Sequence, residues 1–307
     1  MANDTAQFGR VFVVELGDLK LEMRPPAAAL RVQFSVERDK TEIPNNVELA
    51  IWGLSKETRA RLEQAKELSC RVSAGYGSTD PSQIFTGIVS RIESSRDKSD
   101  GVTMLRVSAG DGQDKYQSSK VNKNFAKNTP VHTVLKELIA ATGLASGNVS
   151  QLRDVALASG AKELEGPYMA HGSAVFELQV FADSLGIDWS FQDGQFVGAR
   201  KGQPYNGEGP LLNASTGLID ARLDEFGNVE GTALLLSDLI PGVAFRVEAE
   251  RATGDFVCVA TTHSGDNFDE QNWTVEFHGI PLGALSDGLL PDQAEADDTP
   301  TAPSTVL

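Results

Sequence analysis

The sequence is poor in the residues that build metal centres and nucleophilic sites. It contains two cysteines and four histidines in 307 residues. Cys70 and Cys258 lie within alternating apolar runs, where a free cysteine behaves as a small buried hydrophobe. Structural zinc usually takes four Cys or His ligands, so we expect neither a zinc site nor a disulfide. The sequence also lacks a G-x-S-x-G elbow, an H-E-x-x-H pair and a phosphate-binding glycine loop.

Basic residues and long apolar runs are scarce as well. Lys and Arg total 27 against 43 Asp and Glu, which gives a formal net charge of −16. This charge opposes tight nucleic-acid binding, because that affinity comes mainly from Lys and Arg at the phosphates. It suits a surface that DNA slides past. No apolar run reaches the roughly 18 residues that span a bilayer, and the start MANDTAQFGR does not resemble a signal peptide. We therefore expect folding in a cytoplasm, without membrane insertion.

Alternation of apolar and polar residues dominates both ends of the chain and predicts β-strands, separated by Gly, Pro, Asn and Asp. In the first part the runs are VFVVELG, LRVQFSVER, VELAIWG, SCRVSAGYG, IFTGIVSRIES and TMLRVSAG, between residues 11 and 110. In the later part they are TGLIDARL, GTALLLSDL, VAFRVEAE, DFVCVATTH and NWTVEFHGI. One helix is predicted inside the first part, in KETRARLEQAK, with Ser55 as its N-cap.

The middle of the chain has a different pattern. Helical spacing predicts a helix that opens with Thr129 as N-cap and Pro130 as first helical residue and stops at Gly143. A second helix is predicted from Ser173 to Leu185, followed by a hairpin that turns at Asp193-Gly194. The predicted domains are 1–112, a first β-barrel; 113–200, an inserted α+β domain; and 201–282, a second β-barrel. An acidic, Pro-rich mobile tail is predicted at 283–307.

The two β-rich parts resemble each other in order. VELAIWGLS matches VEGTALLLS, RVSAG matches RVEAE, FTGIVSRI matches FVCVATTH, and TMLRVSAG takes the place of WTVEFHG. Collinearity of these short matches favours two copies of one small antiparallel barrel on either side of the insert. The predicted fold class is therefore mainly β with an α+β insert, and two tube-type antiparallel β-barrels per chain.

Several polar groups were weighed as sites. RDKSDG, residues 96–101, lacks the oxygen ligand and the Glu that a calcium loop needs, so a surface turn is favoured. Glu163 and Glu165 could act as an acid and base pair on a glycoside, although nothing singles this pair out among 43 acidic residues. His132 and His171, beside predicted helix starts, favour structural or solvated roles.

The densest polar stretch is HSGDNFDEQNWTVEFHG, residues 263–279. His263 and His278 would lie near the ends of two paired strands, which leaves a weak metal site open as an alternative. The counterpart RIESSRDKSDGVTMLRVSAG holds the same place in the first copy and carries no histidine. The repeat therefore favours a polar β-hairpin, equivalent to Arg91–Gly110. We expect no catalytic residue, metal ligand or cofactor-binding residue.

Taken in order, these segments resemble the baseplate hub proteins of tailed phages, which are related to late-control (protein D) hubs and to the hub part of type VI secretion spikes. The resemblance rests on NNVELAIWGLSKETRARLEQ, CRVSAGYG, IFTGIVSRIES, TMLRVSAGDG, TGLID, LLLSDLIPG and FVCVATTHSGDNFDEQNWTVEF, and covers about residues 8–282. It implies a homotrimer in which two tube-type barrels per chain make a ring of six similar units around a channel.

The resemblance also implies a function and partners. The ring would adapt a sixfold tail tube, or a tube-initiator protein, to a threefold central spike, contact other baseplate proteins, and let DNA pass without specific binding. The protein would belong to the virion, in the tail baseplate, after assembly in the host cytoplasm. Two alternatives remain at this stage. One is a β-rich, cell-wall-degrading hydrolase, and the other is a carbohydrate-binding module, which would need exposed aromatic platforms where Phe34, Phe85, Phe256 and Trp273 suggest core.

Overall fold

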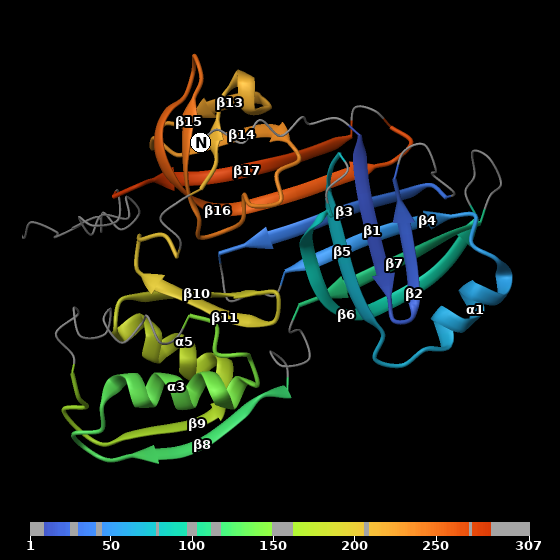
Figure 1. Cartoon of the computed structure of the whole chain (residues 1–307). Helices are drawn as coiled ribbons and strands as arrows, with labels where there is room; N and C mark the ends of the chain where they lie inside the picture. Colours follow the sequence, from blue (N-terminus) through green and yellow to red (C-terminus); the bar gives the residue numbers. More distant parts are fainter. Residues whose placement is uncertain are drawn as a thin grey trace, which may run out of the picture.

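A computed structural model describes residues 9–24, 30–40, 45–77, 80–96, 103–111, 118–148, 162–205, 209–269 and 272–283. Thirteen strands form one curled, almost entirely antiparallel sheet, and a smaller α+β unit packs at one end of it (Figure 1). The predicted class, mainly β with an α+β insert, is confirmed. The turn predicted at 96–101 and the tail predicted at 283–307 lie outside the described residues, except for their first residues.

The first half of the sheet comes from the N-terminal part of the chain. Each predicted strand forms there, together with one edge strand that the pattern had not indicated, β2. The elements are β1 (Arg10–Leu16), β2 (Leu19–Met23), β3 (Val32–Asp39), β4 (Asn46–Trp52), α1 (Lys56–Gln64), β5 (Ser69–Tyr76), β6 (Ser82–Arg96) and β7 (Thr103–Gly110). Ser55 caps α1 as predicted, because its side chain accepts a hydrogen bond from the backbone N–H of Thr58.

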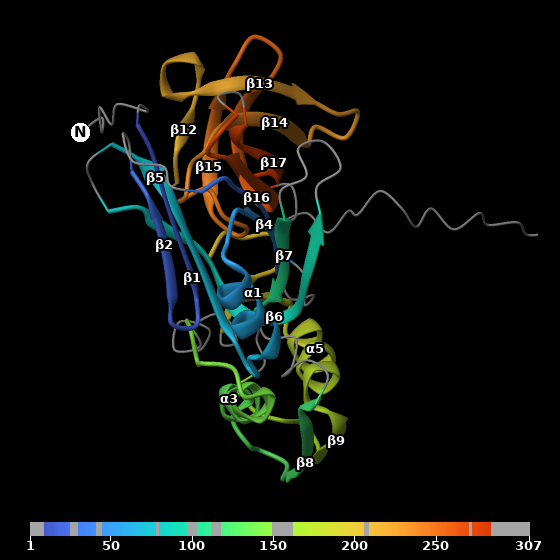
Figure 2. The ribbon, with the colours of Figure 1, turned by 90° about the vertical axis from the view of Figure 1, so that its right-hand side faces the viewer.

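The insert lies below the sheet in both ribbon views (Figures 1 and 2). It consists of β8 (Lys120–Phe125), α3 (Val131–Thr142), β9 (Tyr168–Ser173), α5 (Ala174–Ser184), β10 (Ile187–Gln192) and β11 (Gln195–Arg200). β8 pairs with β9, and β10 pairs with β11. No helix among the described residues is long and apolar enough to cross a membrane.

One helix boundary in the insert differs from the prediction. Pro130, not Thr129, is the N-cap of α3, and it makes no side-chain capping bond. The hydroxyl of Thr129 instead donates to the carbonyl of Ala126 at 2.7 Å, which closes the preceding turn. The other signals hold. Gly143 ends α3 in the left-handed region, Ser173 caps α5, and Asp193-Gly194 turns the β10–β11 hairpin with positive φ at both residues.

The second half of the sheet comes from the C-terminal part of the chain. Its elements are β12 (Leu211–Leu212), η1 (Ala214–Thr216), β13 (Leu218–Leu223), β14 (Val229–Leu234), β15 (Ala244–Glu248), β16 (Thr253–Asp266) and β17 (Trp273–Pro281). All five predicted strands form. The short strand β12 is the exception to antiparallel pairing, because it runs parallel to β15.

The internal repeat is visible in the strand order. The first half runs β3-β4-β7-β6-β5 and the second half runs β13-β14-β17-β16-β15, so the same four pairings join five strands in the same sequence order. A β-bulge interrupts the ladder at the same place in each copy, between Val89 and Arg91 and between Cys258 and Ala260. The register places Ile88 opposite Gly110 and Val257 opposite Ile280. The sequence match of FTGIVSRI with FVCVATTH is therefore shifted by two residues from the structural alignment of the two repeats. The other sequence matches agree with that alignment.

One long strand joins the two halves. The first part of β16 pairs with β15, and its second part, from Ala260 to Asp266, pairs with β3 of the first half. On its other edge β16 pairs with β17 along most of its length. The two repeats therefore share a continuous hydrogen-bonded sheet, a connection that the sequence pattern did not indicate.

The buried apolar residues divide into three cores, one for each β half and one for the insert. Two residues of the second half, Leu235 and Trp273, belong to the core of the first half. The indole ring of Trp273 meets Phe12 and Phe34 edge-on, with ring centroids 6.2 and 5.4 Å away. Such aromatic contacts add to the burial energy, so Trp273 ties the C-terminal strand into the N-terminal core.

Replacing Trp273 by alanine should destabilise the whole 13-stranded sheet. The side chain is 1% exposed, and truncating a buried aromatic costs about 3–5 kcal/mol. We expect a loss of this size in urea unfolding followed by tryptophan fluorescence and far-UV circular dichroism. Phe176→Ala is the matched control, because Phe176 is 64% exposed and should change stability by less than about 0.5 kcal/mol. Equal effects of the two substitutions would contradict this assignment.

Candidate functional site

A single polar face extends across both repeats. Eight strands lie side by side in the order β13-β14-β17-β16-β3-β4-β7-β6. In each, alternate side chains point to the cores and the others point away from them. We call this outward surface the polar face. A soluble sheet with one packed and one polar face is ordinary, but here the face continues without a break across two separate cores.

Register places its side chains in rows across the strands. One row runs Asp220, Thr232, Glu276, Thr262 and Glu37 from β13 to β3. Two outward carboxylates of β16, Asp255 and Asp266, pair with Arg246 and Arg31 from outside the eight strands. Among the other outward positions, acidic groups outnumber basic ones, since seven carboxylates face three arginines: Glu37, Asp39, Glu48, Glu93, Asp220, Glu230 and Glu276 against Arg91, Arg106 and Arg222. The face therefore carries an excess of negative charge, in keeping with the composition of the chain.

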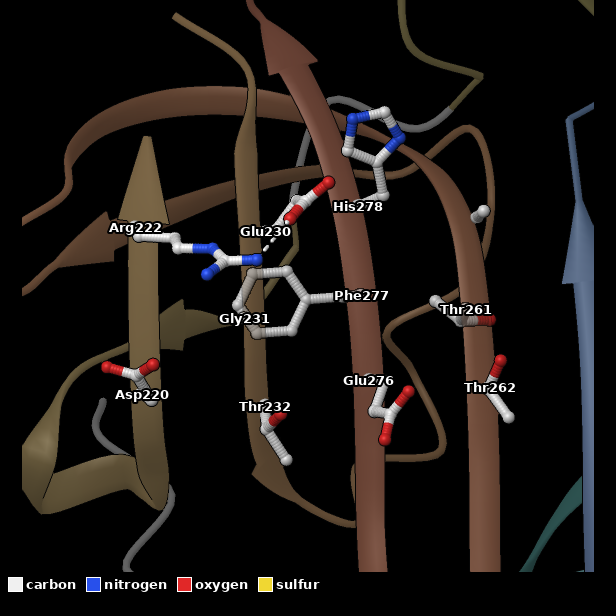
Figure 3. A pocket seen from close by; sticks show the side chains of 11 residues that line it. Asp220, Arg222, Glu230, Gly231, Thr232, Thr261, Thr262, Glu276, Phe277 and His278 are labelled. Atoms are coloured by element: carbon white, nitrogen blue, oxygen red, sulfur yellow. Dashed lines mark hydrogen bonds and ion pairs between the residues drawn. The ribbon is translucent and has the colours of Figure 1, made fainter. Parts of the chain in front are cut away.

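A hollow with a volume of about 480 Å³ lies on this face, over the second repeat (Figure 3). Carboxylates of Asp220 and Glu276 stand beside the hydroxyls of Thr232 and Thr262 there. The guanidinium of Arg222 lies 3.1 Å from the carboxylate of Glu230, and both side chains are exposed. An exposed pair of this kind contributes little to stability. The hollow is open and polar, and it holds no grouping that resembles a catalytic pair.

On the core side of the sheet, beneath the hollow, there is no room for a side chain at Gly231. A Cβ at this position would lie 2.5 Å from the ring of Phe277 and 2.6 Å from the carbonyl oxygen of Asp220. Glycine therefore lets β13 and the Phe277 ring approach β14 closely. Phe277 is 4% exposed and belongs to the core of the second half.

The stretch from 263 to 279 forms the β16–β17 hairpin, the counterpart of β6–β7, as predicted. Its two histidines are not brought together. His263 is fully buried opposite Val275, whereas His278 is half-buried opposite Ala260 and borders the hollow. No group of three or more His, Cys, Asp or Glu side chains with metal-binding geometry occurs among the described residues.

The remaining candidates are scattered. Glu163 and Glu165 are exposed on the edge of the insert, and Glu163 forms an isolated backbone bridge with Pro130. His132 is half-buried in α3, and His171 is exposed on β9.

The two cysteines lie in different cores, Cys70 in the first half and Cys258 in the second. Both are free thiols, and burial raises the pKa of the Cys70 thiol to about 12. Burial also raises the pKa of the Cys258 thiol. Two buried, protonated thiols in separate cores match the interpretation of these residues as small core hydrophobes.

The aromatic residues of the strands lie inside. Phe34, Phe85, Phe256 and Trp273 are each 3% exposed or less, as their alternation predicted. Among the described residues, the large exposed aromatics are Phe176, Phe226 and Phe268, which come from the insert and from two different loops. They do not form the paired platform that stacks against a sugar ring.

A buried polar junction, which sequence reasoning missed, holds the insert against the sheet. The carboxylate of Asp111 accepts hydrogen bonds from the backbone and side-chain nitrogens of Asn45, at 2.7 and 2.8 Å, and from the backbone of Asp193 at 2.9 Å. Arg38, almost fully buried, forms an ion pair with Asp193 at 2.8 Å. Burial raises the pKa of Asp111 to about 7, against the lowering effect of Asn45.

Beside this junction, the two β cores are separated by polar side chains on the inner face of β3 and β16. We call this group, Arg38, Thr261 and His263, the seam. The Nε2 atom of His263 lies 2.9 Å from the carbonyl oxygen of Leu236. Burial, together with the charge of Arg38, lowers the pKa of His263 to about 4, so this histidine is neutral at physiological pH.

The fold is that of phage tail proteins. Among solved structures, the 43 kDa tail protein of prophage MuSo2 from Shewanella oneidensis is similar with a TM-score of 0.62 and 11% identity, over 89% of this chain and 97% of that one. A tail protein from Neisseria meningitidis MC58 gives a TM-score of 0.57 and 13% identity, over 89% and 96%.

A third similar structure is the c3393 protein of E. coli, with a TM-score of 0.52 and 12% identity over 88% and 77% of the two chains. It is described as a component of the type VI secretion system with structural similarity to the T4 bacteriophage tail proteins gp27 and gp5. No protein-family model and no curated protein matches this sequence. At such identities the likeness establishes the fold, and function must be argued from the surface.

His263 should make the fold sensitive to acid. The unfolded chain protonates this residue below about pH 6.5, whereas the folded chain does so only near pH 4. Folded stability is therefore lost as pH falls through this window, by about 3 kcal/mol for a shift of this size. His263→Gln keeps a donor for the Leu236 carbonyl and removes the titration. We expect urea unfolding between about pH 7 and pH 4 to show this loss in the wild type but not in the variant.

The carboxyl group of Asp111 titrates in the same pH range. Because Asp111 is present in both proteins, its contribution to the free energy of unfolding cancels in the difference between them. Parallel stability curves for the wild type and His263→Gln would contradict the buried, neutral state of His263.

Proposed function

We propose that this protein is a non-enzymatic, structural baseplate hub of a phage tail. Three copies form a ring that joins a sixfold tail tube, or its initiator, to a threefold central spike and lines the channel for DNA. The observation that carries the proposal is the polar face, which is built by four strands from each of two five-strand units with the same strand order. Residues 1–112 and 201–282 supply the two ring-forming units, and 113–200 forms the insert.

Symmetry supports the number of copies. Each chain carries two units with the same strand order, so three chains supply six similar units on a threefold axis. Such a ring presents near-sixfold symmetry to a tube and strict threefold symmetry to a spike. A chain with one such unit would need six copies and would offer no built-in threefold contact.

The two ends of the eight-strand run support closure. Among the described residues, the only strand partner of β13 is β14, and the only strand partner of β6 between Arg91 and Ser95 is β7. Both edges therefore offer unpaired backbone groups, which natural proteins usually cover. Neighbouring strands are antiparallel, so the first and last of the eight strands, β13 and β6, run in opposite directions. In a ring, the β13 edge of one copy therefore meets the β6 edge of the next in antiparallel orientation. That orientation allows the sheet to continue from chain to chain.

Apolar side chains at the β13 edge support the same contact. Ile219 and Leu223 point toward the core side of the sheet, yet they are 58% and 42% exposed. The turn that follows exposes Phe226 by 62%. Exposed apolar groups beside an open strand edge favour burial against another protein surface. A neighbouring copy that extends the sheet would cover them.

Dimensions favour three copies over two. Strands lie about 4.8 Å apart, so a closed sheet of 24 strands has a perimeter of about 115 Å and a backbone diameter of about 37 Å before strand tilt widens it. Side chains of about 5 Å leave an opening wider than a DNA duplex. Two copies, with 16 strands, would give a backbone diameter of about 24 Å, too narrow once side chains are included.

Charge supports the passage of DNA without binding. The seven carboxylates of the polar face would line the channel and repel phosphates, while the arginines are too few to release many counterions. The rival classes find little support, because the carboxylates are dispersed along strands and the strand aromatics are buried. We further propose a place in the virion tail baseplate, with assembly in the host cytoplasm and contacts to other baseplate proteins.

Ring formation is tested by mass. The chain weighs 32.8 kDa, so a trimer weighs about 98 kDa, and we expect this species by light scattering or mass photometry at micromolar concentration. The double variant Ile219→Lys, Leu223→Lys should remain folded but run as a monomer, because it places charge at the closing edge. The control is Phe176→Lys with Val180→Lys, two exposed positions on the insert. A wild-type monomer at every concentration, or equal assembly of all variants, would contradict the ring.

Channel charge is tested by reversal. The triple variant Glu37→Lys, Glu48→Lys, Glu276→Lys should gain binding to duplex DNA that weakens steeply with salt, measured by fluorescence anisotropy. The control is Glu57→Lys, Glu67→Lys, Glu225→Lys, which makes the same charge change at exposed sites off the polar face. The wild type should not bind at physiological salt. Equal gains in both triple variants would show that net charge, and not the polar face, governs contact with DNA.

A further inference from the structure

Three buried polar atoms without a partner belong to the seam between the two β cores. Arg38 Nε, Thr261 Oγ1 and His263 Nδ1 have no hydrogen-bond partner among the described residues. The three residues are 3%, 3% and 0% exposed. Thr261 faces Arg38 across the β3–β16 ladder, and His263 follows two residues along β16, so all three point to the same side of the sheet.

The hydrogen-bonding roles of these atoms are fixed by their surroundings. Since the Leu236 carbonyl can only accept, His263 Nε2 carries the hydrogen of that 2.9 Å contact. The other ring nitrogen, Nδ1, is then an acceptor in the neutral ring. Arg38 Nε can only donate, because its guanidinium stays charged, and the hydroxyl of Thr261 can do either.

This mixture of roles selects the ligand. A metal cation would be repelled by the guanidinium of Arg38, which lies close enough to His263 to influence its charge. A simple anion carries no hydrogen for His263 Nδ1. A ligand that donates to one atom and accepts from the other satisfies the set, and water is the small molecule with both capacities. Buried waters in proteins typically make about three such bonds.

We propose that a buried water molecule binds at the seam, where it accepts from Arg38 Nε, donates to His263 Nδ1 and shares a third hydrogen bond with Thr261 Oγ1. The water connects β3 of the first half to β16. Through His263 it also reaches the chain segment that follows β14. It thus acts as a cross-link between the two cores. This inference does not depend on the proposed function, since it concerns the interior of a single chain.

The water is tested on the full chain by selective labelling of threonine methyl groups. We expect a nuclear Overhauser effect between the Thr261 methyl protons and the water resonance. Thr142 is the internal control, because it is 1% exposed and its hydroxyl already donates to the Ile139 carbonyl at 2.7 Å. A water contact at Thr261 but not at Thr142 supports the site. Its absence at Thr261, with the resonance assigned, overturns it.

A second measurement distinguishes the water from a direct side-chain contact. At high resolution, a crystal structure should show a density peak about 2.7–3.2 Å from both Arg38 Nε and His263 Nδ1. Thr261→Val removes one partner and should raise the unfolding equilibrium constant about five- to tenfold relative to Thr261→Ser, which keeps the hydroxyl. A Thr261 hydroxyl bonded directly to His263 Nδ1, with no peak between them, overturns the proposal.

Discussion

The pairing of β16 with two partners on one edge is the constraint on which the architecture depends. Its first part pairs with β15 and its second part with β3, so two repeated units share one strand as a common member of their ladders. Without the contact from Ala260 to Asp266, the halves would be two small sheets, each with its own free edges. With it, the order of strands continues across the molecule, and the polar face becomes one surface.

This shared strand also explains where the cores and the polar residues lie. Along its inner side, β16 passes from the core of the second half, at Phe256 and Cys258, to the core of the first half, where Gly265 leaves room for the rings of Phe34 and Trp273. Between these ends the inward positions are Thr261 and His263. A continuous apolar stripe would have merged two cores into one, whereas the polar residues mark the boundary between them and are confined to it.

The sequence predicted the elements better than their long-range connections. Period-2 runs such as LRVQFSVER identify strands because one side of each is buried, and Ser55, Gly143 and Asp193-Gly194 mark ends and turns through local chemistry. β2, β8 and β9 were missed because the insert strands mix lysines, asparagines and glycines, and because β2 carries charged residues at an edge. The predicted cap at Thr129 is wrong because the hydroxyl of Thr129 already donates to the Ala126 carbonyl, a contact that the sequence pattern does not reveal.

The candidate surface was accessible to sequence reasoning only in part. The repeat and the excess of acidic residues pointed to two units and a negative surface. The polar face itself depends on register, which aligns Glu276 and Thr262 of the β16–β17 hairpin with Glu37 of β3, a strand far away in the chain. The 263–279 stretch illustrates this point. Its composition suggested chemistry, but strand pairing sends His263 inward and leaves His278 at the rim of the hollow.

The contacts that hold the insert against the sheet differ in kind from the apolar contacts within the cores. Directed hydrogen bonds and an ion pair, centred on Asn45, Asp111 and Asp193, join the insert to the sheet. Burying hydrogen-bonded and charged side chains adds little stability compared with an apolar contact. Breaking one of these bonds, however, leaves its buried partner without a hydrogen bond. The junction therefore tolerates only one orientation of the insert on the sheet. An enzyme can place such precision around a substrate. In this chain it is used at the joint between the insert and the sheet, where it fixes the orientation of the insert, as the proposed structural role requires.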